Sequence, residues 1–404
     1  MNPGNGEAVE ASPGAGAGVR LRVARQARGY SQQQLAGMAG VSRQAVSAVE
    51  SGHSDPSLRV ALTLAGALGM TVEDLFGPGS PAPTVAARPV APLGGRGSRV
   101  ALAPMGDSFV ALPLSADSAT RAGFQPAGGL IAAPSGVPAP SGPSGVPAPS
   151  GPSGVPAPSG VPAVVRPLGP PRPTLVVTGC DPALPLLETP LSLLDPPVAF
   201  TWWPCASAEA LRLAEQGLVH AAGAHLRGRS GEYNTGPAQE RLRRGGAEVI
   251  GFSSWREGLV LRPEAGEGIC GLADLARRGL RLVNREEGSE ARHVLDREAR
   301  RLGIDPAAIP GYDTRATGHL QVASAVAAGL ADAGVASEPA ALAYGLAFLP
   351  LAAERFDLVI PAAQVGSREV QGLLKVLTSP WLLTQLASLP GYDPARCGEH
   401  VASL

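Results

Sequence analysis

The chain of 404 residues has few cysteines and almost no lysine. Its four cysteines lie far apart, and none belongs to a Cys-x-x-Cys pair or to a Cys/His group with zinc-ligand spacing. This spacing disfavours a disulfide framework and is typical of a protein from a reducing compartment. Lys375 is the single lysine among 33 Lys and Arg residues, which indicates a GC-rich coding sequence.

Long apolar runs are also missing. No stretch is apolar over the roughly 20 residues that a membrane-spanning helix needs. Residues 1–17 are rich in glycine and alanine and lack the basic region and apolar run of a signal peptide, so we expect a disordered tail there. These absences predict a cytoplasmic protein without membrane contact.

The stretch from Ser31 to Gly52 carries the clearest local pattern. Ser31 and Ser42 are suited to begin two short helices, because a serine hydroxyl accepts a hydrogen bond from a free N–H of the first turn. Gly40 ends the first helix. Two short helices joined by a glycine-containing turn predict a helix-turn-helix, whose second helix enters a major groove. The outward face of that second helix is expected to carry Arg43, Gln44, Ser47 and Glu50.

The segment from Val19 to Phe76 resembles the Xre/Cro-type helix-turn-helix domain. The residues that carry the likeness are Arg25, Arg28–Gln32, Leu35–Ala36, Val41–Ser42, Val46–Ser47, Glu50–Gly52, Pro56 and Leu68–Gly69. The resemblance implies five helices and double-stranded DNA as the partner, with arginine and glutamine reading guanine and adenine. The predicted DNA-binding residues are Gln32, Ser42, Arg43, Gln44 and Ser47. The alternative is a small helical module that binds protein.

The charge of the chain is low for a DNA-binding protein. The net charge is −1, and residues 19–77 hold six arginines against four acidic residues. Such a weakly basic domain has modest non-specific affinity for DNA. We therefore expect a homodimer that depends on specific contacts with its operator.

Composition divides the chain into segments. The predicted boundaries are a tail at 1–17, the helix-turn-helix domain at 18–77, a stiff linker at 78–95, a small β element at 96–132, a Pro/Gly/Ser repeat linker at 133–171 and an α/β domain at 172–404. The β element reads as a hairpin, which needs a neighbouring domain or a second copy to pack against, so it is a candidate dimer contact. The repeat linker holds three tandem copies of PSGVPAPSG from Pro134 onward, which predict an extended spacer.

From residue 172 onward, short apolar runs alternate with helical patterns. Runs such as 175–178, 280–283 and 331–335 are strand-like, and helices are expected between them. This alternation predicts a mostly parallel sheet with helices on both faces.

One loop of this domain has the shape of an anion site. The strand ending at Val283 runs into Gly288–Ser289, where a helix begins, so free N–H groups point toward the carboxyl edge of the sheet. Ser289 offers a hydroxyl, and Arg285 or Arg292 offers positive charge. The alternative is an ordinary helix start with a structural role only.

Residues 174–404 resemble the cytosolic substrate-binding domain related to type II periplasmic binding proteins, which is linked to molybdate or related oxyanions. The likeness rests on Thr178–Leu184, Ala221–Leu226, Asn284–Arg285, Gly288–Ser289, Arg292, Ile304–Pro306, Ile309–Tyr312, His319, Ala331–Gly334 and Asp357–Pro361. It implies two lobes with the ligand between them and crossovers near 251–254 and 356–361. The predicted ligand-binding residues are Gly179, Cys180, His225, Arg285, Gly288, Ser289, Arg292 and His319.

Glu290 departs from the family pattern, which prefers small residues at this position. A carboxylate there would repel an anion unless it points away or pairs with Arg292. Metal ligation is not expected, because no two histidines form an HxxxH or HxH pair, and no cofactor is expected. Cys180 has no histidine near it in the sequence, so a catalytic role is not expected and the chain is not predicted to be an enzyme.

Together these patterns predict a multidomain fold: an all-α helix-turn-helix domain, a small β element, a Pro-rich linker and a two-lobed α/β domain. The predicted function is a sequence-specific DNA-binding transcriptional regulator that senses a small anionic ligand, first of all molybdate or tungstate. The second hypothesis is a regulator whose degenerate sensor domain serves oligomerisation or binds proteins. The third is a molybdopterin-related enzyme.

Overall fold

The computed structural model describes residues 17–76, 84–114, 124–133, 161–228 and 231–404. The chain forms two compact units, Met1–Thr84 and Val85–Leu404. The predicted tail, apart from Ala17, and the three PSGVPAPSG copies lie outside the described residues. Among the described helices, none combines the length and the apolarity that crossing a membrane requires.

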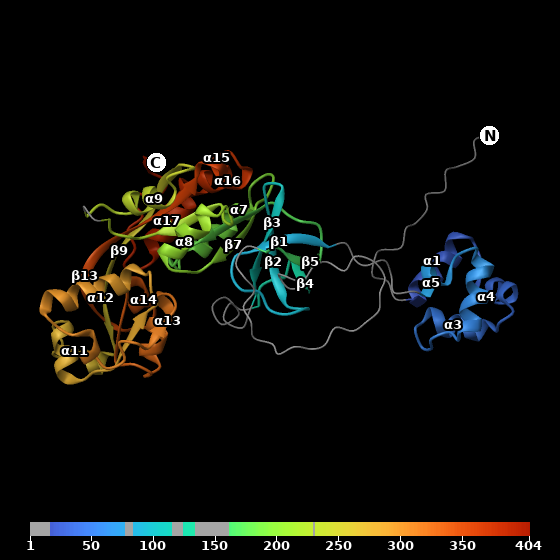
Figure 1. Cartoon of the computed structure of the whole chain (residues 1–404), viewed down its shortest axis with the longest axis horizontal. Coiled ribbons are helices and arrows are strands. Elements are labelled where there is room, and N and C mark those ends of the chain that lie inside the picture. The colour runs from blue at the N-terminus through green and yellow to red at the C-terminus, as the bar shows by residue number, and fades with distance from the viewer. Residues whose placement is uncertain (1–16, 77–83, 115–123, 134–160, 229–230) are drawn as a thin grey trace. The chain divides into compact units, whose positions relative to one another are not determined.

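The first unit is the predicted helical domain (Figure 1). Its helices are α1 (Ala17–Ala27), α2 (Gln32–Ala39), α3 (Arg43–Glu50), α4 (Leu58–Leu68) and α5 (Val72–Phe76). Ser31 forms a capping box with Gln34, and Ser42 caps α3 by accepting a hydrogen bond from the Ala45 N–H. Gly40 adopts a φ of 64°, the left-handed conformation that ends α2 without a β-carbon penalty. The local sequence signals therefore set the two helices of the motif.

Glu50 does not point outward as expected. It is 3% exposed, and its carboxylate pairs with Arg25 of α1, with Nε to Oε1 at 2.6 Å and Nη2 to Oε2 at 3.1 Å. Helical spacing gives no information about a partner on another helix, so the sequence pattern assigned Glu50 to the wrong face. The ion pair joins α1 to α3.

The β element is a closed barrel rather than an isolated hairpin. Its strands are β1 (Val85–Pro89), β2 (Arg99–Met105), β3 (Ser108–Pro113), β4 (Gly129–Ala133) and β5 (Ala163–Pro167), in the order β1-β3-β2-β4-β5. The predicted hairpin corresponds to β2 and β3. Two of the strands, β1 and β5, lie in segments that the sequence analysis assigned to linkers. Each is five residues long and ends in proline, and each pairs with a strand far away in the chain, so local composition hid it.

The barrel packs on the α/β domain through a shared apolar core. Val90, Met105, Val110 and Leu112 of the barrel are buried together with Leu211 and Leu218 of the α/β domain. The barrel segment therefore has the neighbouring domain that the hairpin pattern required.

The rest of the second unit is a two-lobed α/β domain, as predicted. Lobe one contains β6 (Thr174–Thr178), η1 (Leu184–Leu187), α7 (Glu188–Ser192), β7 (Ala199–Trp203), α8 (Ser207–Glu215), β8 (Ala221–Ala224), α9 (Thr235–Arg241), α15 (Ala362–Val365), α16 (Arg368–Leu377), α17 (Pro380–Ser388) and β14 (His400–Ser403). Lobe two contains α10 (Pro263–Gly266), α11 (Leu272–Arg278), β10 (Leu282–Arg285), α12 (Glu290–Leu302), η2 (Pro306–Ala308), β11 (Arg315–Ala316), α13 (His319–Ala327), β12 (Ala333–Ser337) and α14 (Glu338–Ala343).

Two long strands, β9 (Ala247–Leu261) and β13 (Ala347–Pro361), belong to both lobes and run from one group of helices to the other (Figure 1). They pair antiparallel at the centre of a mixed sheet ordered β11-β10-β12-β9-β13-β8-β6-β7, with β14 also paired to β9. The sheet was expected to be mostly parallel. Parallel pairing occurs on either side of the central pair, where β10 pairs with β12 and β6 pairs with β7 and β8. In the sequence, residues 248–252 and 257–261 read as two separate strands, because polar residues at the lobe junction lie between them. In the structure they form the single strand β9.

Candidate functional site

The candidate DNA interface is the outward face of α3. Arg43, Gln44 and Ser47 are all exposed, as helical spacing predicts. Ser42 is exposed too, and its hydroxyl accepts the Ala45 N–H at 3.1 Å, which fixes the start of α3. The Gln32 amide donates to Glu50 Oε2 at 2.9 Å. Gln32, the first residue of α2, is therefore held by the buried ion pair at the last residue of α3.

The candidate ligand site lies where the two lobes meet. We call it the interlobe cluster, and it consists of Cys180, His225, Glu257, Arg285, His319 and Glu354, all buried. Cys180 follows β6, and His225 follows β8 in lobe one. Arg285 ends β10, and His319 begins α13 in lobe two. The carboxylates of Glu257 and Glu354 come from the long crossing strands β9 and β13.

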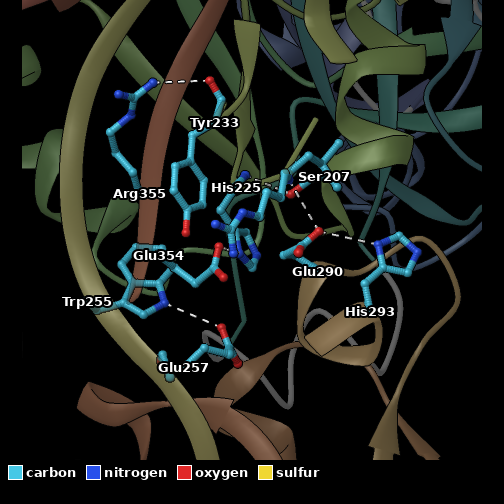
Figure 2. A network of polar contacts seen from close by, with 12 residues as sticks. Ser207, His225, Tyr233, Trp255, Glu257, Glu290, His293, Glu354 and Arg355 are labelled. Atoms are coloured by element: carbon cyan, nitrogen blue, oxygen red, sulfur yellow. Dashed lines mark hydrogen bonds and ion pairs between the residues drawn. The ribbon is translucent and has the colours of Figure 1, made fainter. Parts of the chain in front are cut away.

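Short distances connect the six side chains. Cys180 Sγ lies 3.0 Å from His225 Nε2, and His225 Nδ1 lies 3.8 Å from Glu354 Oε2. Figure 2 shows the Glu354 carboxylate directed toward His225, with Trp255 and Glu257 below it. The rings of His225 and His319 are 5.5 Å apart. Arg285 Nη1 donates to His319 Nδ1 at 3.0 Å. Both lobes and both crossing strands thus converge on one buried polar site.

Several buried atoms of this site have no hydrogen-bond partner among the described residues. They are His225 Nδ1, Glu257 Oε1, His319 Nε2 and both carboxylate oxygens of Glu354. A buried polar group without a partner costs about 1–3 kcal/mol, and a cluster of such groups indicates a missing water, ion or ligand.

The surroundings shift the pKa values of these groups in different directions. Burial opposes a charge on His225, but the neighbouring Cys180 thiol and Glu354 carboxylate raise its pKa well above the usual value. Burial and the charge of Arg285 lower the pKa of His319 well below its usual value. Burial raises the pKa of Glu257 to about 7, and the charge of Glu354 adds to the increase. These shifts favour the charged form of His225, the neutral form of His319 and, relative to a free carboxyl, the protonated form of Glu257.

Cys180, His225 and His319 offer three ligand atoms within 4.8 Å of one another, the donor set of a zinc or copper site. The hydrogen bonds of His319 disfavour coordination. Arg285 Nη1 and the Ser337 N–H both donate to its Nδ1, at 3.0 and 3.2 Å, so the neutral ring must carry its proton on Nε2. Neither ring nitrogen then has a free lone pair for a metal, and Nε2–H is a donor for a ligand.

The sequence analysis set Cys180 aside because no histidine lies near it in the sequence. The structure corrects this reasoning. Strands β6 and β8 are parallel neighbours, with Thr178 paired to Ala222, so the residues that follow them meet at one edge of the sheet. The pairing of Cys180 with His225 follows from that topology.

The Gly–Ser loop of lobe two begins helix α12, which is the structural role that the sequence analysis gave as the alternative to an anion site. The Ser289 hydroxyl donates to Glu286 O and accepts the Arg292 N–H, so it caps α12. The Arg292 guanidinium lies over the Tyr312 ring, 5.0 Å from its centroid, and donates to Arg285 O. The structure brings Cys180, His225, Arg285 and His319 together, whereas Ser289 and Arg292 are engaged elsewhere.

The two predicted glycines shape the backbone. Gly179 has a φ of 135°, and a β-carbon there would lie 2.9 Å from Gly223 Cα, so glycine permits the close approach of β6 and β8. Gly288 adopts a φ of 79° just before the α12 cap. Both glycines therefore allow backbone conformations that other residues rarely adopt.

Glu290, the departure from the family pattern, is buried. It pairs with Arg297 and not with Arg292, and Arg297 Nη2 lies 2.7 Å from Glu290 Oε1. Its other oxygen accepts the Arg227 N–H at 3.4 Å and lies 3.3 Å from His293 Nδ1 (Figure 2). Burial would raise its pKa, but the contacts with His293 and Arg297 lower it. Since Arg227 belongs to lobe one, Glu290 joins the lobes.

Sequence reasoning missed Glu257 and Glu354. Each lies within a 15-residue strand, and each is buried, with 0% and 3% exposure. The sequence signal that could have identified them is a charged residue with strand-like residues on both sides. Recognising it required knowing that these strands cross between lobes.

The chain is similar to known proteins over both units. The family profile described as helix-turn-helix matches residues 21–75, and the one described as PBP superfamily domain matches residues 190–378. The uncharacterized protein YvgK of Bacillus subtilis (strain 168) is 29% identical over 241 residues, 57% of this chain and 74% of that protein.

Two further similarities concern one unit each. An uncharacterized HTH-type transcriptional regulator of Methanocaldococcus jannaschii is 40% identical over 57 residues, 14% of this chain and 86% of that protein. A phosphate ABC transporter substrate-binding protein from Clostridium perfringens, solved with bound phosphate, is 12% identical with a TM-score of 0.40, covering 53% of this chain and 96% of that one. The helix-turn-helix profile and the Methanocaldococcus jannaschii regulator show that the chain belongs to the HTH-type transcriptional regulators. A PBP-like α/β domain follows the DNA-binding unit in the sequence.

Proposed function

We propose that this protein is a cytoplasmic, homodimeric transcriptional regulator that binds a small anion at the interlobe cluster, and that molybdate or tungstate is the first anion to test. One observation carries the proposal. Polar atoms of His225, Glu257, His319 and Glu354 are buried without partners among the described residues, and they come from both lobes and both crossing strands. A ligand that supplied the missing partners would bind the closed arrangement of the lobes.

The donors of the cluster favour an oxyanion. Arg285 carries a fixed charge, His319 Nε2 has no hydrogen-bond partner among the described residues, and the raised pKa of His225 favours its charged form. The carboxylates oppose an anion unless they are protonated, and the pKa of Glu257 near 7 permits this at neutral pH. The site therefore suits an anion that binds together with a proton.

The cluster is buried while the lobes are in contact, so the ligand must enter when they separate. The long strands β9 and β13 are the covalent connection between the lobes and the place for a hinge. A ligand that binds only the closed form shifts the domain toward it. We propose that closure alters the pairing of two chains and thereby the spacing of their α3 helices on the operator.

Thermal melting of the full chain with molybdate, tungstate, sulfate, phosphate, small carboxylates and nucleotides tests the ligand. A ligand that binds only the folded state raises the melting temperature, and at 100 times its Kd it adds about 2.7 kcal/mol of stability. We expect a selective increase that His319→Asn abolishes. Arg292→Ala is the matched control, since Arg292 stacks on Tyr312, and it should retain the increase.

Glu257→Gln keeps the shape of the site and removes a negative charge, so it should strengthen the anion response. This gain separates a binding effect from a folding defect. If no compound raises the melting temperature of the parent protein or of Glu257→Gln, the sensor proposal fails. A domain used for oligomerisation or for a protein partner would then be the better explanation.

Selection of operator sequences from random DNA with the full chain tests the other half of the proposal. We expect a two-fold symmetric site, because a dimer presents two α3 helices. Arg43→Ala and Gln44→Ala should each cost about 1–3 kcal/mol at their base pairs. Arg300→Ala removes the same charge from an exposed position in α12 and should leave operator affinity unchanged.

A further inference from the structure

A cavity of about 930 Å³ lies between the barrel and lobe one, and Glu286, Glu287 and Thr317 of lobe two also line it. None of the six residues of the interlobe cluster lines it. Its size is that of small-molecule sites, which span about 300–1,000 Å³ and often lie between domains. One wall is formed by barrel residues such as Leu102 and Leu112, and the opposite wall by the edge strand β7 with Trp202 and Trp203.

The walls are held in place without a ligand. Trp202 Nε1 donates to Gly179 O at 2.9 Å, which fixes the indole. Leu112 is buried in the core that the barrel shares with lobe one, and Trp203 packs against that core. A preformed aromatic and aliphatic surface binds ligands with little cost for ordering side chains.

The polar groups of the cavity are mostly carboxylates. They belong to Glu188, Glu209, Glu286 and Glu287, whereas Arg172 is the one basic residue among the described residues that line it. Arg212, Arg285 and Arg315 pair with three of these carboxylates. The Glu286 side chain is 21% exposed and that of Glu287 is 72% exposed, so both can accept hydrogen bonds from a ligand. The exposed Thr317 adds a hydroxyl beside them.

We propose that this cavity is a second ligand site, and that it binds an aromatic small molecule carrying a protonated amine. The rings lie against Trp203, which packs on the side of the sheet that faces the barrel, and the ammonium group donates to the carboxylates of Glu286 and Glu287. An anionic ligand of the same shape would meet the partly exposed carboxylates of Glu286 and Glu287 and should bind more weakly. The chemistry of this site is therefore opposite in charge to that of the interlobe cluster.

The test uses the full, DNA-free chain and two fluorescent probes of similar size. 9-Aminoacridine has three fused rings and is protonated at neutral pH, whereas anthracene-9-carboxylate has three fused rings and a negative charge. We expect saturable binding of 9-aminoacridine, and binding of the carboxylate at least about tenfold weaker. Replacing an attraction by a repulsion between unit charges about 4 Å apart in water costs about 2 kcal/mol.

Substitutions then locate the site. Trp203→Leu should weaken 9-aminoacridine binding about tenfold, the effect of losing an aromatic stacking partner. Trp381→Leu is the control, since Trp381 is an exposed tryptophan of α17 that does not line the cavity, and it should have no effect. Thr317→Arg at an exposed position places a cation beside Glu286 and should weaken 9-aminoacridine about fivefold while strengthening the anthracene carboxylate.

Three results would overturn the proposal. They are absence of saturable 9-aminoacridine binding, equal affinity for both probes, and binding that neither Trp203→Leu nor Thr317→Arg weakens. Thr317→Arg covers the case in which Trp203→Leu fails to fold. Glu257→Gln should leave probe binding unchanged, so a failure of the interlobe proposal does not affect this one.

Discussion

Glu50 is the residue on which the DNA-binding unit most depends. Its buried carboxylate binds Arg25 of α1 and Gln32 of α2, so one side chain of α3 joins three helices. Glu50→Gln leaves the Arg25 charge without a counter-ion, and breaking a buried ion pair in this way costs about 3–5 kcal/mol. We expect faster hydrogen exchange of the α1–α5 amides in the full chain and weaker DNA binding.

Asp55→Asn is the matched control, since Asp55 is an exposed carboxylate of the same unit. Equal exchange rates in Glu50→Gln and Asp55→Asn would contradict a structural role for the ion pair.

The stability that this ion pair gives the DNA-binding unit should also depend on pH, with a definite sign. Burial opposes ionisation of Glu50, but the hydrogen bonds from Arg25 and Gln32 lower its pKa. The stabilisation is therefore complete above the unfolded-state pKa and is lost as pH falls through the folded-state pKa.

Glu257 sets the expected pH dependence of ligand binding. Its pKa of about 7 means that it is protonated below pH 7 and charged above it, beside His225, Arg285 and Glu354. A charged Glu257 repels an anion, so the affinity for the anion found by melting should fall as pH rises above 7, by up to about tenfold per pH unit. Titration calorimetry from pH 6 to 8 measures this. Glu257→Gln should have nearly constant affinity, and a slope retained in that variant would assign the proton to another group.

At the scale of single residues, the sequence predicted the exposed face of α3 because helical periodicity and serine caps are local signals. It also singled out Cys180, His225, Arg285 and His319, each of which ends or follows a strand or begins a helix. It could not predict the partners of Glu50, Glu257 and Glu354, because those partners lie on other elements.

At the scale of elements, the sequence located strands that are apolar along their whole length. It divided β9 because Ser253, Ser254 and Arg256 interrupt the apolar pattern at the lobe junction. It missed β1 and β5, whose alternating residues become strands only when the barrel closes. Non-local pairing therefore determined the elements that local composition missed.

Arg88 of β1 forms a polar link between the barrel and lobe one. Its guanidinium donates to Gln216 O at 3.0 Å and to Gly217 O at 2.6 Å, just beyond the carboxyl end of α8, where the helix dipole favours a cation. Arg88→Ala should lower the free energy of unfolding of the barrel by about 2 kcal/mol, the value of hydrogen bonds to a charged donor.

Hydrogen exchange of the β1 and β3 amides measures this change. Arg166→Ala removes an exposed arginine from β5 of the same barrel and serves as the control. If both variants exchange alike, the apolar core alone fixes the barrel. If only Arg88→Ala exchanges faster, the hydrogen bonds to the end of α8 contribute as expected.

At the scale of the whole second unit, Glu286 connects the two proposed ligand sites. Its carboxylate lines the barrel cavity, and its oxygens bind Arg285 at 2.7 and 2.9 Å. Arg285 in turn donates to His319 in the interlobe cluster. An ammonium group at Glu286 competes for the carboxylate and leaves more of the Arg285 charge for an anion between the lobes.

If both site proposals hold, the two ligands should therefore bind cooperatively. We expect 9-aminoacridine to increase the affinity for the interlobe anion about fivefold, and the anion to increase the affinity for 9-aminoacridine by the same factor, because coupling free energies are reciprocal. Glu286→Gln should strengthen anion binding by itself and abolish the coupling. Affinities for each ligand that are identical in the presence and absence of the other would show that the sites act separately, even if both are occupied. A coupling of opposite sign would mean that the Arg285–Glu286 pair must stay intact for the anion to bind.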